Sequence, residues 1–337
     1  MAHEIETAFF AKQPAWHGLG VRVPENVSVK EAMRLAGLDW KVGTMGMQTV
    51  NPLTGDLVLA DGQAIFRLSD GRKLGESGKG YQPIQNEDAF AVFDGLRDKC
   101  AIHTAGSLRN GERVWMLAQL PGGFTIGKND KNLPFLLATT GHDGKLAFHT
   151  LPTSVRVVCA NTLRLAIGTA NGENVKVKGA MTVKHRGNVK DSIAEVTAAI
   201  DRASAMHVRF GGFAGALSEV AMSGGDMRDL AQVVVPENPD AGDRHKARVE
   251  DDRSAVLSAF YHGAGNKGQT GWDGLNAVTE WTATQRGQRS TQEARMEQTW
   301  FGEGDATVQR AVNWLSSKYS LGYGEETPAQ QHVYVSA

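Results

Sequence analysis

The fold is decided by residues 101–120, which read AIHTAGSLRNGERVWMLAQL. Two apolar runs, 101–108 and 113–120, flank Asn110-Gly111, a dipeptide that favours tight hairpins because both residues tolerate positive φ. The stretch therefore predicts two antiparallel strands joined by a short turn.

The same pattern extends to both sides of this hairpin. Further strands are predicted at 57–60, 64–68, 135–140 and 145–149, with turns at Asp61-Gly62, Asp70-Gly71 and Asp143-Gly144. Pro152 is placed to open a helix that runs to about Ile167. On that helix Arg156 and Arg164 would lie about 80° apart and share one basic side.

Helix signals begin early and dominate the later half. Ser28 and Glu31 form a capping box that predicts a helix over 29–36, and Asn86 is predicted to cap a helix over 87–99. After Asn188 the apolar period changes to that of helices. Helices are predicted there at 193–203 and beyond, at 226–234 and at 243–261. Two more are predicted after the Thr270/Asp273 cap and from Asp305 onward.

We therefore predict an α+β fold, with an antiparallel hairpin-rich sheet and helices in the N-terminal half and a mostly helical C-terminal half. The predicted parts are an α+β domain over 1–190, a helical region over 191–322 and a tail over 323–337. Four tryptophans of the helical region could supply an oligomer contact or fill a helical core: Trp272, Trp281, Trp300 and Trp314.

Composition indicates a globular protein with a sizeable core. The 337 residues are 41% hydrophobic and 22% charged, and no apolar run approaches the roughly 18 residues of a membrane span. Residues 1–10 do not resemble a secretory signal, because they include His3, Glu4 and Glu6. We expect a cytoplasmic protein without membrane contact, in which Cys100 and Cys159 are reduced.

Charge is concentrated in residues 144–190. This basic segment holds eight Lys or Arg against one acid, Glu173, while the whole chain has a net charge of −1. Clustered cations gain by displacing counterions from phosphates, so the segment is typical of a polyanion site. The predicted nucleic-acid-binding residues are its eight cations, Lys145, Arg156, Arg164, Lys176, Lys178, Lys184, Arg186 and Lys190, together with Tyr81, which could offer a ring face to a base.

The spacing within this segment favours one basic face. Lys176, Lys178, Lys184 and Arg186 are all even-numbered, and side chains alternate between the faces of a strand. A turn at Gly179-Ala180 would instead divide them between two strands. A solvated edge that prevents aggregation remains the alternative interpretation.

Candidate chemistry outside the basic segment is sparse. Residues 75–80, GESGKG, lack the spacing and the Ser/Thr of a phosphate loop and are better explained as a turn. A metal site is also considered, but its candidate ligands lack the close sequence spacing typical of zinc sites. They are His103, His142, His149 and Asp143. Cys159 and His149 could act as nucleophile and base, but a buried structural thiol at Cys159 is the more ordinary interpretation. No catalytic residue, metal or cofactor is predicted.

Four motifs occur together along the chain: WHGLG at 16–20, GYQPIQN at 80–86, CANTLR at 159–164 and WDGLNAVTE at 272–280. With them the chain resembles the phage/plasmid-like protein family, a domain-of-unknown-function family of bacteriophages and plasmids. The resemblance implies a setting among mobile-element genes in a bacterial host cell. It supplies no active site.

The leading hypothesis is a single-stranded DNA-binding protein, acting as an ATP-independent strand-annealing recombination protein. Hairpins followed by a helix and a basic strand are similar to the core of the RecT and Erf annealing families, which implies a homo-oligomer. Annealing needs a basic groove and free bases rather than bond chemistry. The alternatives are a metal-dependent nucleic-acid enzyme and a non-enzymatic phage/host interaction protein whose basic strand meets an acidic partner.

Overall fold

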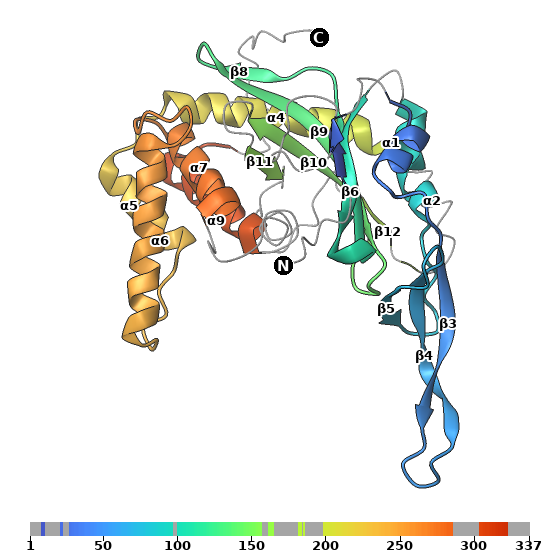
Figure 1. Cartoon of the computed structure of the whole chain (residues 1–337). Helices are drawn as coiled ribbons and strands as arrows, with labels where there is room; N and C mark the ends of the chain where they lie inside the picture. The colour runs from blue at the N-terminus through green and yellow to red at the C-terminus, as the bar shows by residue number, and fades with distance from the viewer. Residues whose placement is uncertain are drawn as a thin grey trace. The chain divides into compact units, whose positions relative to one another are not determined.

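The chain divides into two compact units in a computed structural model (Figure 1). The first unit comprises 1–120, 135–151 and 179–203, and the second comprises 121–134, 152–178 and 204–337. The structure describes residues 8–10, 21–22, 27–96, 100–156, 161–164, 181–183, 185, 198–285 and 303–322. The predicted boundary near residue 190 falls outside these ranges and stays a prediction.

The larger sheet has the strand order β11-β10-β9-β7-β6-β1-β2, with β12 on β10 and β8 on β9. Its strands are β1 (Ala8–Phe10), β2 (Val21–Arg22), β6 (Ala101–Leu108), β7 (Arg113–Gln119), β8 (Phe124–Ile126), β9 (Asp130–Gly141), β10 (Phe148–Arg156), β11 (Asn161–Arg164) and β12 (Met181–Val183). The predicted hairpin at its centre is confirmed. Leu108 pairs with Arg113 across a turn in which Asn110 and Gly111 have φ of 55° and 96°.

The helix predicted from Pro152 to Ile167 is wrong. Residues Phe148–Arg156 and Asn161–Arg164 form the antiparallel strands β10 and β11 instead. Position 164 pairs with Thr153 and position 156 pairs with Asn161. Position 164 therefore lies opposite position 153, which is three residues from position 156 on the same strand. The single helix that would have given both arginines a shared side does not form.

A second sheet has three strands, β3 (Val42–Val50), β4 (Leu57–Arg67) and β5 (Lys73–Ser77). The predicted turn at Asp61-Gly62 is wrong, because β4 runs through both residues. The pairs Gly46–Gln63 and Gln48–Leu59 show the reason: β4 has extra residues there, which form a bulge. The turn at Asp70-Gly71 between β4 and β5 is confirmed.

Helices α1 (Val29–Leu35) and α2 (Asn86–Phe90) pack in the first unit, and the 3₁₀ helix η1 (Ala91–Leu96) continues α2. The Ser28 half of the predicted capping box is confirmed, since its Oγ accepts from the backbone N–H of Glu31, but the Glu31 carboxylate pairs with Arg34. The cap predicted at Asn86 is wrong, because Gln85 holds the N-cap position and the Asn86 side chain bonds elsewhere. The apolar core of this unit contains the fully buried side chains of Phe90, Phe93 and Phe148.

The later part of the chain is helical, as predicted. Its elements are α4 (Ala198–Glu219), α5 (Gly224–Val234), α6 (Asp243–His262), α7 (Gly271–Glu280), the π turn η4 (Trp281–Gln285) and α9 (Glu303–Tyr319). Both halves of the Thr270/Asp273 capping box are present. The α+β fold class is therefore confirmed.

The core of the second unit is aromatic. Trp272 and Trp281 are buried with Phe124, Phe210 and Phe260, and Trp314 packs against this cluster. Trp272 donates its Nε1–H to Asp130 Oδ2 at 2.7 Å. These tryptophans thus fill the core, while Trp300 lies outside the described residues. None of the described helices has the length and apolar character needed to cross a bilayer.

Candidate functional site

A buried polar chain links three segments of the first unit. Asn86 donates its Nδ2–H to Leu38 O at 2.9 Å, and its Oδ1 lies 2.8 Å from Nε2 of His142. Since Oδ1 can only accept, Nε2 of His142 carries the proton. That tautomer leaves Nδ1 as an acceptor, and Nδ1 has no hydrogen-bond partner within the described structure.

The environment of His142 keeps its ring neutral. Burial and, to a lesser extent, the neighbouring His185 lower the pKa of His142 to about 3, against the opposing charge of Asp143. The rings of Trp40 and His142 meet edge to face with their centroids 5.2 Å apart. The guanidinium of Arg67 lies over the Trp40 ring. This arrangement is a structural anchor rather than a proton donor near neutral pH.

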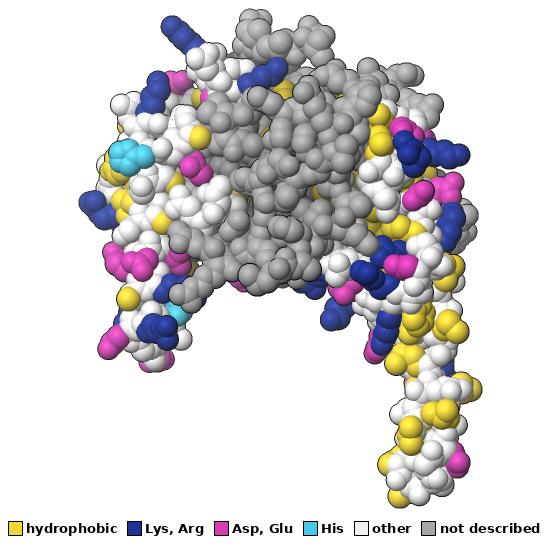
Figure 2. All heavy atoms as spheres, viewed as in Figure 1, with side chains coloured by type: hydrophobic (Ala, Val, Ile, Leu, Met, Phe, Trp, Pro, Cys, Tyr) yellow, Lys and Arg dark blue, Asp and Glu magenta, His cyan; other side chains and the backbone are white. Residues whose placement is uncertain are grey.

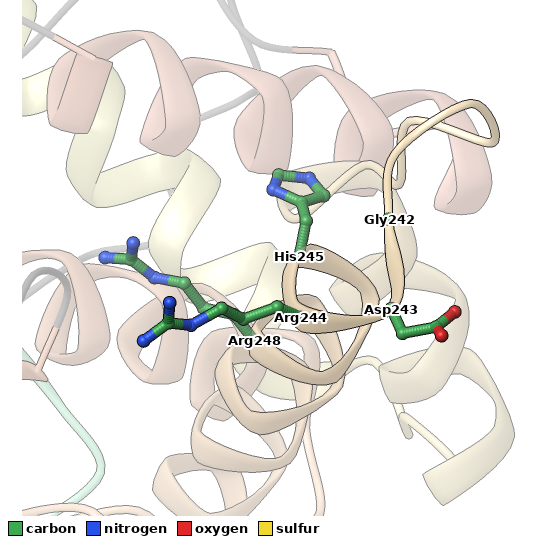
Figure 3. Close-up of a pocket in the computed structure, with 5 residues that line it drawn as sticks. All are labelled: Gly242, Asp243, Arg244, His245 and Arg248. Carbon is green, nitrogen blue, oxygen red and sulfur yellow. The ribbon is translucent and has the colours of Figure 1, made fainter.

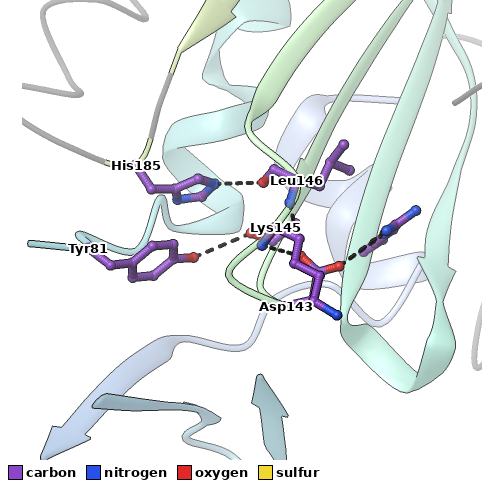
Figure 4. A network of polar contacts seen from close by, with 7 residues as sticks. Tyr81, Asp143, Lys145, Leu146 and His185 are labelled. Carbon is purple, nitrogen blue, oxygen red and sulfur yellow. Dashed lines mark hydrogen bonds and ion pairs between the residues drawn. The ribbon is translucent and has the colours of Figure 1, made fainter. Parts of the chain in front are cut away.

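Tyr81 and His185 stack beside this anchor (Figure 4). Their centroids are 4.7 Å apart at an interplanar angle of 15°. His185 Nδ1 lies 3.2 Å from Gln82 O, and Nε2 lies 3.1 Å from Leu146 O. One face of Tyr81 is thus covered by His185, and burial raises the pKa of the Tyr81 hydroxyl.

The turn after β9 is held by Asp143. Its Oδ1 accepts from the backbone N–H of Lys145 and Leu146, and its Oδ2 pairs with Arg113 at 3.2 Å. Burial alone would raise the pKa of Asp143, but these backbone N–H groups and Arg113 lower it below its ordinary value. Gly144 has φ of 76°, and a Cβ there would lie 2.1 Å from Glu76 O, so the turn requires glycine.

The residues considered for a metal site have other partners. His103 packs edge-on against Phe135, His142 bonds to Asn86, Asp143 pairs with Arg113, and His149 lies opposite Thr182 in the β10–β12 ladder. Among the residues that the structure describes, no group of three His, Cys, Asp or Glu could hold a metal ion. Cys159 lies outside the described residues.

Cys100 lines a small cavity of about 240 Å³ together with Val27, Phe93 and Ile102. Burial raises the pKa of its thiol to about 11. A thiol with that pKa is almost fully protonated at neutral pH, and the thiolate is the nucleophilic form. The thiol of Cys100 is therefore a weak nucleophile at neutral pH.

The predicted nucleic-acid-binding residues are only partly described. Lys145 is exposed in the turn held by Asp143, and Arg156 and Arg164 lie in β10 and β11. Lys176, Lys178, Lys184, Arg186 and Lys190 lie outside the described residues. Convergence of the basic segment on one face thus stays a prediction.

A second basic surface lies in the other unit, at the start of α6 (Figure 3). Gly242, Asp243, Arg244, His245 and Arg248 line an open pocket of about 500 Å³. Arg244 and Arg248 are four residues apart and extend side by side from the same face of the helix. Within the described part of the chain, Arg244, Lys246 and Arg248 are exposed and form no ion pair.

This basic turn can bind anions. The positive end of the helix dipole acts together with Arg244 and Arg248, and Asp243 is the one acid among the described residues that line the pocket. We name residues 242–248 the α6 basic turn. The sequence shows it as DRHKAR at 243–248, but the stronger charge excess of 144–190 drew the prediction away from it.

The buried anchor is a feature that sequence reasoning missed. His142 was considered only as a metal ligand and Asn86 only as a helix cap. The two residues bond to each other across 56 positions of the chain, a separation at which no local sequence pattern signals a contact.

Comparison with known proteins identifies a family. A family model described as Domain of unknown function (DUF932) matches residues 73–300. No curated protein and no solved structure matches the chain significantly. Because residues 73–300 make up more than half of the 337 residues, the chain belongs to the DUF932 family.

Proposed function

We propose that the protein binds single-stranded DNA of a phage or plasmid and anneals complementary strands without ATP. The observation that carries this proposal is the α6 basic turn, whose three cations are exposed and unpaired within the described structure. Cations without carboxylate partners are the ones that gain most from phosphates, because they lose no existing ion pair.

The chain's charge distribution supports the same class of ligand. The basic segment 144–190 adds eight cations with one acid, in a chain whose net charge is −1. Two separate stretches therefore concentrate positive charge on a protein that is otherwise acidic. A polyanion explains such an arrangement better than a small anion, which would need only one site.

The mobile-element setting comes from the resemblance to the phage/plasmid-like family. Strand annealing fits that setting because it needs a cationic surface and no bond chemistry. A homo-oligomer in the cytoplasm of a bacterial host is part of the proposal, since annealing proteins align two strands on a ring or filament.

The test measures affinity for a labelled single-stranded oligonucleotide at several salt concentrations. Replacing Arg244, Lys246 and Arg248 by Ala should weaken binding and flatten the log–log salt dependence by up to about 2 units, at about 0.7 per phosphate contact. A matched control replaces Lys41, Arg72 and Lys73, whose charges are already paired with Glu87, Asp70 and Glu76. This control removes the same charge and should leave the slope close to that of the wild type.

Three outcomes would contradict the proposal. These are no binding at low salt, equal slopes for both triple variants, and a failure to accelerate pairing of complementary strands in an ATP-free fluorescence assay. Metal-dependent cleavage of the oligonucleotide would favour the enzyme alternative instead.

A further inference from the structure

The β3–β4 hairpin of the first unit extends beyond the third strand of its sheet (Figure 1). β5 pairs with β4 only from Gln63 to Phe66, whereas β3 and β4 pair with each other as far as Val50 and Leu57. We name residues 45–60 the distal arm. Over most of its length it is a ribbon of two strands within the described structure.

The distal arm exposes large apolar side chains. Their exposed fractions are 66% for Met45, 57% for Val50, 93% for Leu53, 67% for Leu57, 40% for Val58 and 82% for Leu59. Figure 2 shows hydrophobic side chains gathered along this projecting hairpin. Contiguous exposed apolar surface of this kind marks interaction sites on soluble proteins.

The register places much of this surface on one face. Val50 lies opposite Leu57, and Gln48 lies opposite Leu59. Paired residues share a face of the ribbon, and so do residues two apart on one strand. Val50, Leu57 and Leu59 therefore lie next to one another on one face of the ribbon, with Gln48 beside them.

Charge is almost absent from the distal arm. Between Lys41 and Asp56 no residue is charged, in a chain of which 22% of residues are charged. Soluble proteins usually protect an open strand edge with charges or proline, and β3 contains neither. A two-stranded ribbon is also only marginally stable alone in water. A partner packed on a face of the ribbon would supply the support that two strands alone lack.

The absence of Lys and Arg from the distal arm favours some kinds of binding partner over others. Nucleic acid and anionic membranes are attracted by Lys and Arg, and the distal arm has none. A second copy of the same arm fits, because in a two-fold contact each surface meets itself and an uncharged surface does not repel its own copy. Counted on both copies, the three side chains of this face expose on the order of 700 Å², which is at the low end of interface sizes and fits a weak, reversible contact.

We infer that the protein forms a two-fold dimer in which the distal arms of two copies pack against each other through the Val50, Leu57 and Leu59 face. This inference concerns self-association and does not rest on the proposed function. It assigns the oligomer contact to the sheet of the first unit, whereas Trp272 and Trp281 are buried in the helical core.

Sedimentation velocity over a dilution series of the full chain tests the dimer. Leu57→Glu with Leu59→Glu should weaken dimerisation by about 100-fold or more, because the contact would bury carboxylates without partners. The control is Leu68→Glu, which changes a leucine of similar exposure, 62%, outside the distal arm. It should remain a dimer, and all three proteins should have similar melting temperatures.

A shortened arm provides a second, independent variant. Replacing residues 47–62 by Asn-Gly joins Gly46 to Gln63, which are already paired, through a turn that hairpins favour. The product should be a folded monomer. A wild-type chain that is monomeric at its highest soluble concentration overturns the inference, and so does a dimer that survives in either arm variant.

Discussion

His142 donates its Nε2–H to Oδ1 of Asn86 across 2.8 Å, and both side chains are completely buried. This bond joins the turn after β9 to the start of α2, and Asn86 continues it to the backbone at Leu38. A single amide thus fixes three loops of the first unit.

Asn86→Ala should destabilise the first unit by about 2–4 kcal/mol, because it leaves Leu38 O and the His142 N–H without partners inside the protein. Urea or thermal unfolding of both proteins measures the difference. Asn51→Ala is the control, since Asn51 makes its bond to Leu53 N in an exposed turn, and it should cost less than about 1 kcal/mol. Equal losses for the two variants would show that burial of the amide does not matter.

Acid should destabilise the protein through His142. The pKa of His142 is about 3 in the fold, below the value of roughly 6.5 for an unfolded histidine. The unfolded chain therefore binds the extra proton between these values, and stability falls as pH decreases from about 6.5 towards 3, by about 1.4 kcal/mol per pH unit.

Unfolding free energies at several pH values check this dependence. His142→Gln should be less stable than the wild type at pH 7, and the gap should shrink as the pH falls. His245→Gln, at an exposed histidine, is the control. A gap that stays constant with pH would contradict a neutral, buried His142.

The basic segment makes its own prediction. Replacing Lys176, Lys178, Lys184 and Arg186 by Ala should flatten the salt dependence of single-stranded DNA binding by up to about 3 units. Melting temperature should change little if those residues are exposed, as predicted. An unchanged slope would remove this segment from the interface and favour the interaction-protein alternative.

The two capping boxes should differ in strength. Asp273 is buried and accepts from the backbone N–H groups of Gln269 and Thr270, whereas Asp226 lies at an exposed helix start beside Lys318. Asp273→Ala should cost about 2–4 kcal/mol and Asp226→Ala about 1 kcal/mol. Parallel denaturation of the two variants measures this ranking, and a larger loss for Asp226→Ala would reverse it.

Short-range signals explain which parts of the fold were predictable. The Asn110-Gly111 turn, the Ser28 cap and the Thr270/Asp273 box each act within three residues, and these three predictions are confirmed. The physical cause lies in the backbone itself, in positive φ or in unpaired N–H groups at a helix start.

Long-range partners explain the errors. The sequence over 152–164 contains β-branched residues that suit strands, and residues 152–156 and 161–164 pair within the sheet as parts of β10 and β11. The local pattern at Asn86 resembles a cap, yet its partners lie 48 and 56 residues away. The α6 basic turn was visible in the sequence, but only the structure shows that its cations form no ion pair with any residue described.

The bond between Trp272 and Asp130 spans 142 residues of the chain. At synthesis rates of about 5–20 residues per second, Phe124 and its neighbours emerge from the ribosome on the order of ten seconds before the helices that bury them. During that interval Phe124 lacks its aromatic partners Phe210 and Trp272. We therefore expect the newborn protein to depend on chaperones, and truncated messages that end before Trp272 to yield aggregation-prone products.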